Sequence, residues 1–496
     1  MKYYLQLEKE IEQICQINNV INLLQWDIAT NMPAGSATSR EQEITTLSLI
    51  VQRKLKSNKI TDLLEKVQGE SDQLNQWQLA NLREIDKIVE KALCIDDDLH
   101  ARFVSSTTQS ELVWRQARLD NDYAKLKPYL QTVLECVQEI AKVQSQRFNC
   151  SLYDALVDEY DPGRQASEIK EVFAVLKRKL PPLIQRVIDK QQSQTVIPLN
   201  KKISIEQQKL IAKKLMQIME FDLNQGRLDE STHPFCGGTP YDIRLTNRYD
   251  ENNFLSGLMG VIHETGHGLY EQNLPANYKN QFVGKAKGMA IHESQSLFME
   301  MQVGRSKEFM EFLAKLLRDE VAFQGPEYSS ENLYKLATRV KRNFIRVDAD
   351  EVTYPLHVIL RYEIEEALIN NDLTLDELPL YWNQKMQEYL GITPDSDREG
   401  CLQDIHWPMG SFGYFPAYVN GAIIASMLMK SIQELYPQIG QEIMIGNFRN
   451  LNQFLNKNIR SFGSLKTTKQ LLQDATGQNQ INPDIFLSYL EQKYLG

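Results

Sequence analysis

The sequence has few cysteines and no paired-cysteine motif, and its basic residues are outnumbered by acidic ones. None of the six cysteines belongs to a CxxC pair, which argues against a disulfide scaffold and favours free thiols in a reducing compartment. With 55 Lys and Arg residues against 65 Asp and Glu residues, the net charge is −10 and no basic patch stands out. Nucleic acid and anionic membranes are therefore not expected partners.

A hydrophobic leader and an unbroken membrane span are also lacking. The first ten residues mix charged and apolar side chains, which is not the pattern of a secretory signal, so we expect a cytoplasmic protein. Residues 405–429 carry no formal charge, but prolines, glycines and an asparagine interrupt this stretch. Such a sequence does not form a lipid-facing helix.

Helix-breaking residues are missing from much of the first third. There is no glycine between Gly69 and Gly163 and no proline between Pro33 and Pro128. Apolar residues recur there at helical spacing, which predicts long amphipathic helices. Further helices are expected over 166–192, 203–219, 331–344 and 422–435.

Interruptions in this helical pattern are local. The Pro181–Pro182 pair is expected to break or kink the helix over 166–192, because proline lacks the N–H donor and clashes with the preceding turn. Strand signals are few, and the best short candidates are 196–199 and 241–246. Loops rich in glycine, proline and aromatic residues, at 231–241 and 400–418, are where a functional site is expected.

The sequence shows no repeat at a fixed period, no low-complexity tract and no linker. It therefore predicts one large, mostly α unit over residues 1–496 with a small β element. We expect the helices to form walls around a cleft, with the amino-terminal helices as one wall.

Histidine is scarce, and its distribution points to the second half of the chain. Six of the seven histidines follow residue 232, and one pair forms an HExxH motif, His263-Glu264-Thr-Gly-His267. On a helix, positions i and i+4 share one face, so both imidazoles can reach one Zn²⁺ with Glu264 beside its open position as the general base. The alternative is two histidines on a polar helix face, but the flanking residues are apolar and a buried pair needs a partner such as a metal.

A catalytic zinc needs a third protein ligand from another element. Glu293 is the best candidate, because it lies in a second helix-forming run, Ala290–Met299, whose apolar residues can pack against the first helix. The alternative for Glu293 is a solvated side chain. A His₂Glu set suits Zn²⁺, and Co²⁺ is also possible.

Several motifs of this sequence resemble those of the carboxypeptidase Taq family of metallocarboxypeptidases. The resemblance extends along most of the chain. The motifs that carry it are His233-Pro-Phe235, Asp242-Ile-Arg-Leu-Thr246, His263-Glu-Thr-Gly-His267, His292-Glu-Ser-Gln295, Ile345-Arg-Val-Asp-Ala-Asp350 and Gly400-Cys-Leu-Gln-Asp-Ile-His-Trp407, together with Trp26-Asp-Ile-Ala-Thr-Asn-Met-Pro33 and Tyr153-Asp-Ala-Leu-Val-Asp-Glu-Tyr160.

This resemblance implies a helical subunit with a deep groove, a homodimer, and release of single residues from peptide carboxyl termini with broad side-chain tolerance. It places the metal on His263, His267 and Glu293 and the catalytic carboxylate on Glu264. The substrates would be peptides with a free carboxyl terminus.

Substrate-binding residues are expected in the glycine-rich loops and near the arginine-containing motifs. His233, His406 and Tyr414 are candidate donors to the oxyanion, and a structural packing role stays open for each. Arg346 is the first choice for binding the terminal carboxylate and Arg244 the second, because arginine binds carboxylates in a bidentate manner. The alternative for both arginines is a structural ion pair with a nearby aspartate, namely Asp348, Asp350 or Asp242.

Two other functions stay open at this point. A zinc endopeptidase or oligopeptidase would use the same motif without a carboxylate-binding arginine. A non-catalytic helical protein with a structural metal would need a fourth ligand, for which Cys236 beside His233 is the residue to check.

Overall fold

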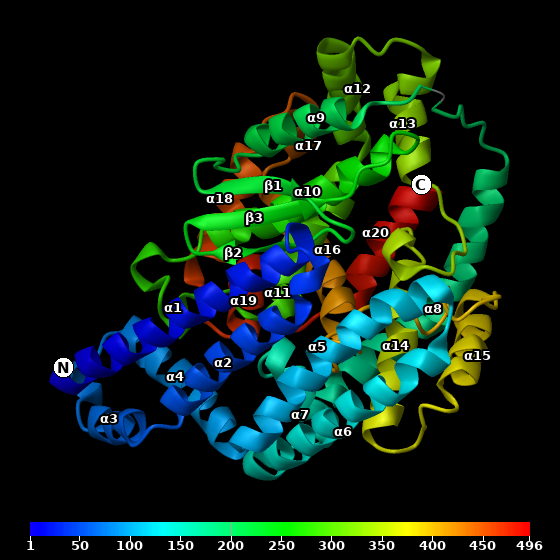
Figure 1. The fold of residues 1–496 in the computed structure, drawn as a ribbon. Helices are drawn as coiled ribbons and strands as arrows, with labels where there is room; N and C mark the ends of the chain where they lie inside the picture. The colour runs from blue at the N-terminus through cyan, green and yellow to red at the C-terminus, as the bar shows by residue number, and fades with distance from the viewer. Residues whose placement is uncertain (200) are drawn as a thin grey trace.

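The computed structural model describes residues 1–199 and 201–496 and is predominantly helical, as the sequence predicts (Figure 1). The α-helices of the described residues are α1 (Lys2–Thr30), α2 (Ala37–Leu55), α3 (Asn58–Gln68), α4 (Gln76–Cys94), α5 (Asp97–Asp120), α6 (Tyr123–Phe148), α7 (Leu152–Tyr160), α8 (Ala166–Gln192), α9 (Ile205–Ile218), α10 (Phe254–Gln272), α11 (Gly288–Leu297), α12 (Lys307–Val321), α13 (Ser330–Ala337), α14 (Tyr354–Ile369), α15 (Leu378–Leu390), α16 (Pro416–Leu435), α17 (Ile439–Met444), α18 (Arg449–Asn458), α19 (Thr468–Thr476) and α20 (Pro483–Leu495). These bounds confirm helices at 203–219 and 422–435 to within a few residues.

A three-stranded sheet lies beside α10 (Figure 1). Its strands are β1 (Gly226–Glu230), β2 (Cys236–Thr239) and β3 (Asp242–Asn247), in the order β1-β3-β2. β1 runs parallel to β3 and β2 runs antiparallel to it. The strand expected at 241–246 is confirmed as β3, whereas β2 lies in a stretch that the sequence analysis assigned to a loop. Two glycines in β2 weakened its strand signal.

The hydrophobic side chains form two separate cores. The larger core extends from α5 to α20 and contains the helices around the sheet. The smaller core lies between α1, α3 and α4 at the amino-terminal end, and it also takes in Phe282 from the segment that precedes α11. Phe282 therefore links the amino-terminal helices to the rest of the molecule.

Hydrogen bonds reinforce that junction. The Asn81 side chain on α4 donates to the Tyr4 hydroxyl at 3.1 Å and to Gln281 Oε1 at 2.9 Å, and Asn81 Oδ1 accepts from the backbone N–H of Val283 at 3.2 Å. All these groups are buried. The amino-terminal helices therefore fix the position of the segment that leads into α11.

The expected break at the proline pair is wrong. Pro181 and Pro182 lie inside α8, which is assigned as one helix from Ala166 to Gln192. The flanking residues Leu180, Leu183 and Ile184 are buried in the larger core. This packing keeps the chain helical even though the two prolines cannot donate backbone hydrogen bonds.

The strand expected at 196–199 is also absent, because a side chain takes the place of a neighbouring strand. The residues Val196–Leu199 have no regular secondary structure. The backbone N–H of Ile197 donates to Asn332 Oδ1 at 2.8 Å, and its carbonyl accepts from Asn332 Nδ2 at 2.9 Å. The backbone of Ile197 is thus satisfied without a sheet.

The helix expected over 331–344 is shorter than predicted, and α13 ends at Ala337. Distant side chains accept the backbone hydrogen bonds beyond it. Gln191 Oε1 accepts from the N–H of Val340, and Asp350 Oδ2 accepts from the N–H of Lys341, each at 2.9 Å. These contacts replace further helical turns.

Among the described residues, no helix is both long enough and apolar enough to cross a membrane. This agrees with the interrupted pattern of the uncharged stretch at 405–429.

Candidate metal centre

The HExxH motif lies on α10, as predicted. Asn253 caps this helix by accepting a hydrogen bond from the backbone N–H of Ser256. Apolar residues on the helix, among them Leu258 and Ile262, are buried. They anchor α10 in the larger core and hold the motif in place.

Glycines allow the helices around the motif to approach closely. A Cβ atom at Gly266 of α10 would lie 2.4 Å from the carbonyl oxygen of Gln295 on α11. A Cβ atom at Gly421 of α16 would lie 2.9 Å from Cβ of Glu293. Larger residues at either position would push α10 or α16 away from the helix that carries Glu293.

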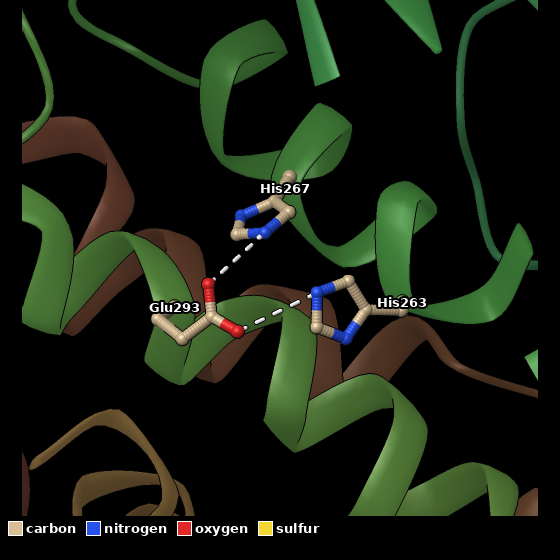
Figure 2. A group of neighbouring side chains, drawn as sticks. All are labelled: His263, His267 and Glu293. Atoms are coloured by element: carbon tan, nitrogen blue, oxygen red, sulfur yellow. Dashed lines mark ion pairs between the residues drawn. The ribbon is translucent and has the colours of Figure 1, made fainter. Parts of the chain in front are cut away.

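His263, His267 and Glu293 converge between α10 and α11 (Figure 2). One potential ligand atom from each of the three residues lies within 4.8 Å of the others. His263 Nε2 is 3.5 Å from Glu293 Oε1, and His267 Nε2 is 3.4 Å from Glu293 Oε2. The carboxylate thus lies between the two imidazoles, with one oxygen directed at each.

The residues of this cluster fit a divalent metal. The three side chains supply two imidazole nitrogens and a carboxylate, which is a known ligand set of catalytic metal sites. Glu293 Oε1 and Glu264 Oε2 are buried and have no hydrogen-bond partner in the part of the chain that the structure describes. Buried carboxylate oxygens need a partner, and a cation supplies one. Cys236 does not belong to the cluster of potential ligands.

The electrostatics of the cluster differ between the two histidines. Burial by itself would lower the pKa of His263, but Glu293, Glu264 and the hydrogen-bonded Glu300 raise that pKa to about 10. Burial lowers the pKa of His267 to about 4. Without a metal, His263 therefore holds the proton that balances the surrounding carboxylates, whereas His267 is neutral.

Glu264 lies next to this cluster and is buried on α10. Burial raises the pKa of its carboxyl group to about 8, with nearby Glu293 and Glu300 acting in the same direction. A carboxyl group with a pKa near neutrality can both accept and return a proton at physiological pH.

Arg346, His406 and His233 form a second polar region. Arg346 is buried and makes two hydrogen bonds to Asp404, from Nε at 3.0 Å and from Nη2 at 2.9 Å. Desolvation by the surrounding protein and the nearby Arg346 lower the pKa of the exposed His233 to about 4, and burial lowers that of His406. The sequence-predicted ion pair of Arg346 with a nearby aspartate exists, but its partner is Asp404 rather than Asp348 or Asp350.

Arg244, the second arginine considered for the substrate carboxylate, is bound elsewhere. Its guanidinium contacts both carboxylate oxygens of Asp242, with the shortest distance 2.8 Å. The same group lies 4.4 Å from the ring centroid of Trp26 on α1. Arg244 therefore connects β3 with the amino-terminal helix.

Tyr414 precedes α16 and packs against aromatic neighbours. Its ring lies 5.3 Å from the His406 ring and 5.1 Å from the Tyr418 ring, centroid to centroid. The Tyr418 hydroxyl is 3.2 Å from His406 Nε2. Burial raises the pKa values of Tyr414 and Tyr418, and the charge of Glu293 acts in the same direction. The sequence analysis missed Tyr418, which lies on α16 only four residues after the candidate Tyr414.

His292 contacts one of the candidate ligands but does not belong to the group of candidate ligands. Its ring stacks on that of His267 with centroids 4.5 Å apart, and its Nε2 is 2.8 Å from Glu271 Oε1. His292 is not one of the three residues whose potential ligand atoms converge.

A helical fold with an HExxH motif on one helix and a carboxylate on the next defines a metallopeptidase. Residues 6–494 match the profile of the carboxypeptidase Taq (M32) metallopeptidases. The chain belongs to this family, as its motifs predicted, and a divalent metal is part of the family's activity.

Relatives match the whole chain. Carboxypeptidase 1 of Bacillus subtilis is 33% identical over 98% of this chain and 96% of its own length. A thermostable carboxypeptidase 1 of Pyrococcus furiosus is 30% identical over 99% of this chain and 98% of its own length. Among solved structures, Trypanosoma cruzi metallocarboxypeptidase 1 has a TM-score of 0.95 and 37% identity, with all of both chains covered. The fold and the enzyme class are therefore those of metallocarboxypeptidases.

Proposed function

We propose that this protein is a zinc carboxypeptidase that releases single amino acids from peptide carboxyl termini with broad side-chain tolerance. The observation that carries this proposal is the convergence of His263, His267 and Glu293, with Glu264 buried beside them. The full-length match to a metallocarboxypeptidase family supports the same activity.

The three converging side chains would hold Zn²⁺, and Co²⁺ suits the same ligand set. When bound, the metal would polarise the carbonyl of the last peptide bond and acidify water. Glu264 accepts a proton from the attacking water and then passes it to the nitrogen of the leaving amino acid. Its raised pKa of about 8 suits this exchange.

His233, His406 and Tyr414 are proposed to donate hydrogen bonds to the oxyanion or the substrate, and Tyr418 joins them because of its contact with His406. The His233 side chain is exposed although desolvation by the surrounding protein lowers its pKa to about 4. An exposed side chain near the buried Arg346 can reach a bound peptide, which supports a substrate-binding position.

Arg346 stays the first choice for the terminal carboxylate of the substrate. Its hydrogen bonds to Asp404 use Nε and Nη2, so Nη1 is the nitrogen that a substrate carboxylate would contact. Arg244 stays the second choice; Asp242 binds its Nε and Nη2 in the same way as Asp404 binds those of Arg346. The proposed substrates are peptides with a free carboxyl terminus. A homodimer and a cytoplasmic location are also proposed, the first from family resemblance and the second from the free cysteines, which suit a reducing compartment.

Product analysis by mass spectrometry tests this function. The zinc-loaded protein is incubated with one peptide as the free acid and as the carboxyl-terminal amide, each with and without a chelator. We expect single residues to be released from the free acid alone, and the chelator to stop this release. Internal cleavage of both peptides would instead show an endopeptidase, and no cleavage of either would favour a non-catalytic role.

A further inference from the structure

The segment that follows α11 changes its helical geometry next to the metal centre. α11 ends at Leu297, and the chain continues as the π-helical segment η5 (Phe298–Gly304). π-helical turns are rare and occur frequently at functional sites. Because the wider turn shifts the direction of each following side chain, it alters where Glu300 points.

Glu300 points at a predicted metal ligand. Its Oε2 lies 2.9 Å from Nδ1 of His263. A carboxylate only accepts hydrogen bonds, so this contact places a proton on Nδ1. When His263 is neutral, Nε2 is then the free nitrogen, and this atom is the one that faces Glu293 at 3.5 Å.

We propose that Glu300 is a positioning residue that fixes the tautomer and ring orientation of His263 for metal binding. This inference rests on the proposed metal site. Carboxylates that accept the second N–H of a ligating histidine raise the basicity of the ligand and hold its ring in place.

Glu300 is itself held from two sides. Its Oε1 accepts a hydrogen bond from Arg305 Nη2 at 2.7 Å, and Arg305 Nη1 donates to the carbonyl of Ala337 at 2.8 Å. Glu300 is therefore held in place by a hydrogen-bonded guanidinium that is itself anchored to the backbone.

The carboxyl-terminal helix holds the backbone of the same segment. The carbonyl of Met301, next to Glu300, accepts hydrogen bonds from the Tyr489 hydroxyl at 3.1 Å and from Lys493 Nζ at 3.0 Å. Both donors lie on α20, and both also contact the buried carboxylate of Glu351. The π-helical geometry around Glu300 is thus fixed by a part of the chain far away in sequence.

A second carboxylate–imidazole pair nearby provides a matched control. Glu271 contacts Nε2 of His292 at 2.8 Å, which resembles the contact of Glu300 with His263. His292 is not in the group of potential metal ligands. Replacing Glu271 therefore removes a similar hydrogen bond from an imidazole that stacks on His267 but supplies no ligand atom itself.

The experiment measures Zn²⁺ affinity by competition with a chromophoric chelator. Glu300→Gln should weaken Zn²⁺ binding by about 10–100-fold, and Glu271→Gln by less than about 2-fold. Because Glu300→Gln leaves the half-buried Arg305 without its carboxylate, the double variant Glu300→Gln with Arg305→Met is measured too. If the folded double variant loses as much Zn²⁺ affinity as Glu300→Gln alone, the loss comes from the missing contact with His263 and not from the unpaired Arg305. Circular dichroism confirms the fold of each variant.

Two ligand variants separate failure of this inference from failure of the metal site. His263→Ala and Glu293→Ala should abolish stoichiometric Zn²⁺ binding. If they do and both Glu300 variants bind Zn²⁺ like the wild type, Glu300 has no positioning role. If the ligand variants themselves bind Zn²⁺ normally, the proposed site is wrong and the inference is overturned with it.

Discussion

The amino-terminal helices and the metal centre bury different kinds of side chain. The core between α1, α3 and α4 is made of aliphatic and aromatic residues such as Leu7, Ile11 and Ile60, and it contains few polar groups. Around the metal centre, by contrast, charged residues such as Glu293, Arg346 and Asp404 are each less than 10% exposed. The first region is stabilised by apolar packing, and the second requires a partner for each buried charge.

This difference teaches which region carries chemistry. Apolar packing is non-directional, so the amino-terminal core tolerates rearrangement at a cost in stability alone. The polar region holds fixed charges in low dielectric, where each one shifts the pKa of its neighbours. Substitutions in the two regions should therefore have different consequences.

The largest effect is expected from replacing the proposed general base. Glu264→Gln keeps the shape of the side chain but removes its ability to accept a proton. We expect kcat to fall by about 10²–10⁴-fold while zinc content stays unchanged. Steady-state kinetics on a free-acid peptide, with metal analysis of the same sample, check this. An active Glu264→Gln enzyme would assign the base elsewhere.

Breaking the buried ion pairs should have the next largest effect. Asp404 binds Arg346 at 2.9 Å and Arg361 at 2.8 Å, so Asp404→Asn leaves two buried guanidinium groups without their carboxylate. We expect a loss of about 3–5 kcal/mol in the free energy of unfolding, measured by urea denaturation. The control is Glu139→Gln, whose exposed pair with Arg102 should matter little. A loss below about 1 kcal/mol for Asp404→Asn would show that water or another group compensates.

The sequence predicted the parts of the site that depend on short-range spacing. His263 and His267 are four residues apart, so a helix brings them to one face. Glu293 was found because it lies in a second helix-forming run, and the structure places it between these histidines. Its role as a ligand stays a prediction.

Contacts between distant parts of the chain were not predictable. Arg346 pairs with Asp404, which lies 58 positions away in the sequence. The prediction named Asp348 and Asp350 instead, because they are closer to Arg346 in the sequence. Glu300 was missed because neither hydrophobic periodicity nor spacing indicates a π-helical turn. In each case tertiary packing decides the partner.

The same substitution in both regions separates stability from metal binding. Leu7 in the amino-terminal core is 0% exposed and Leu297 at the end of α11 is 2% exposed. Each Leu→Ala change should cost about 2–5 kcal/mol of stability through the cavity it leaves. Zn²⁺ affinity should fall only in Leu297→Ala, because that residue supports the helix of Glu293. Equal affinity losses in both variants would show that the two regions are coupled.

The smallest expected effect is a pH dependence of stability that comes from the metal centre and not from the apolar core. Glu293, Glu264 and Glu300 raise the pKa of His263 to about 10 against the effect of burial, so this imidazole carries a proton at pH 7 in the metal-free protein. The stability gained from this proton is complete below the unfolded-state pKa of about 6.5 and is lost as the pH rises towards 10.

Metal binding must displace that proton, so Zn²⁺ affinity should rise by up to about tenfold per pH unit from pH 7 towards pH 10. Calorimetry in two buffers of different ionisation enthalpy counts the protons released. About one is expected at pH 7 from His263. The Glu264→Gln variant is the better sample, because Glu264 also titrates near pH 8 and would add to the count. Zero protons released from this variant would mean that His263 is already neutral, and that the charges around the metal centre are balanced without it.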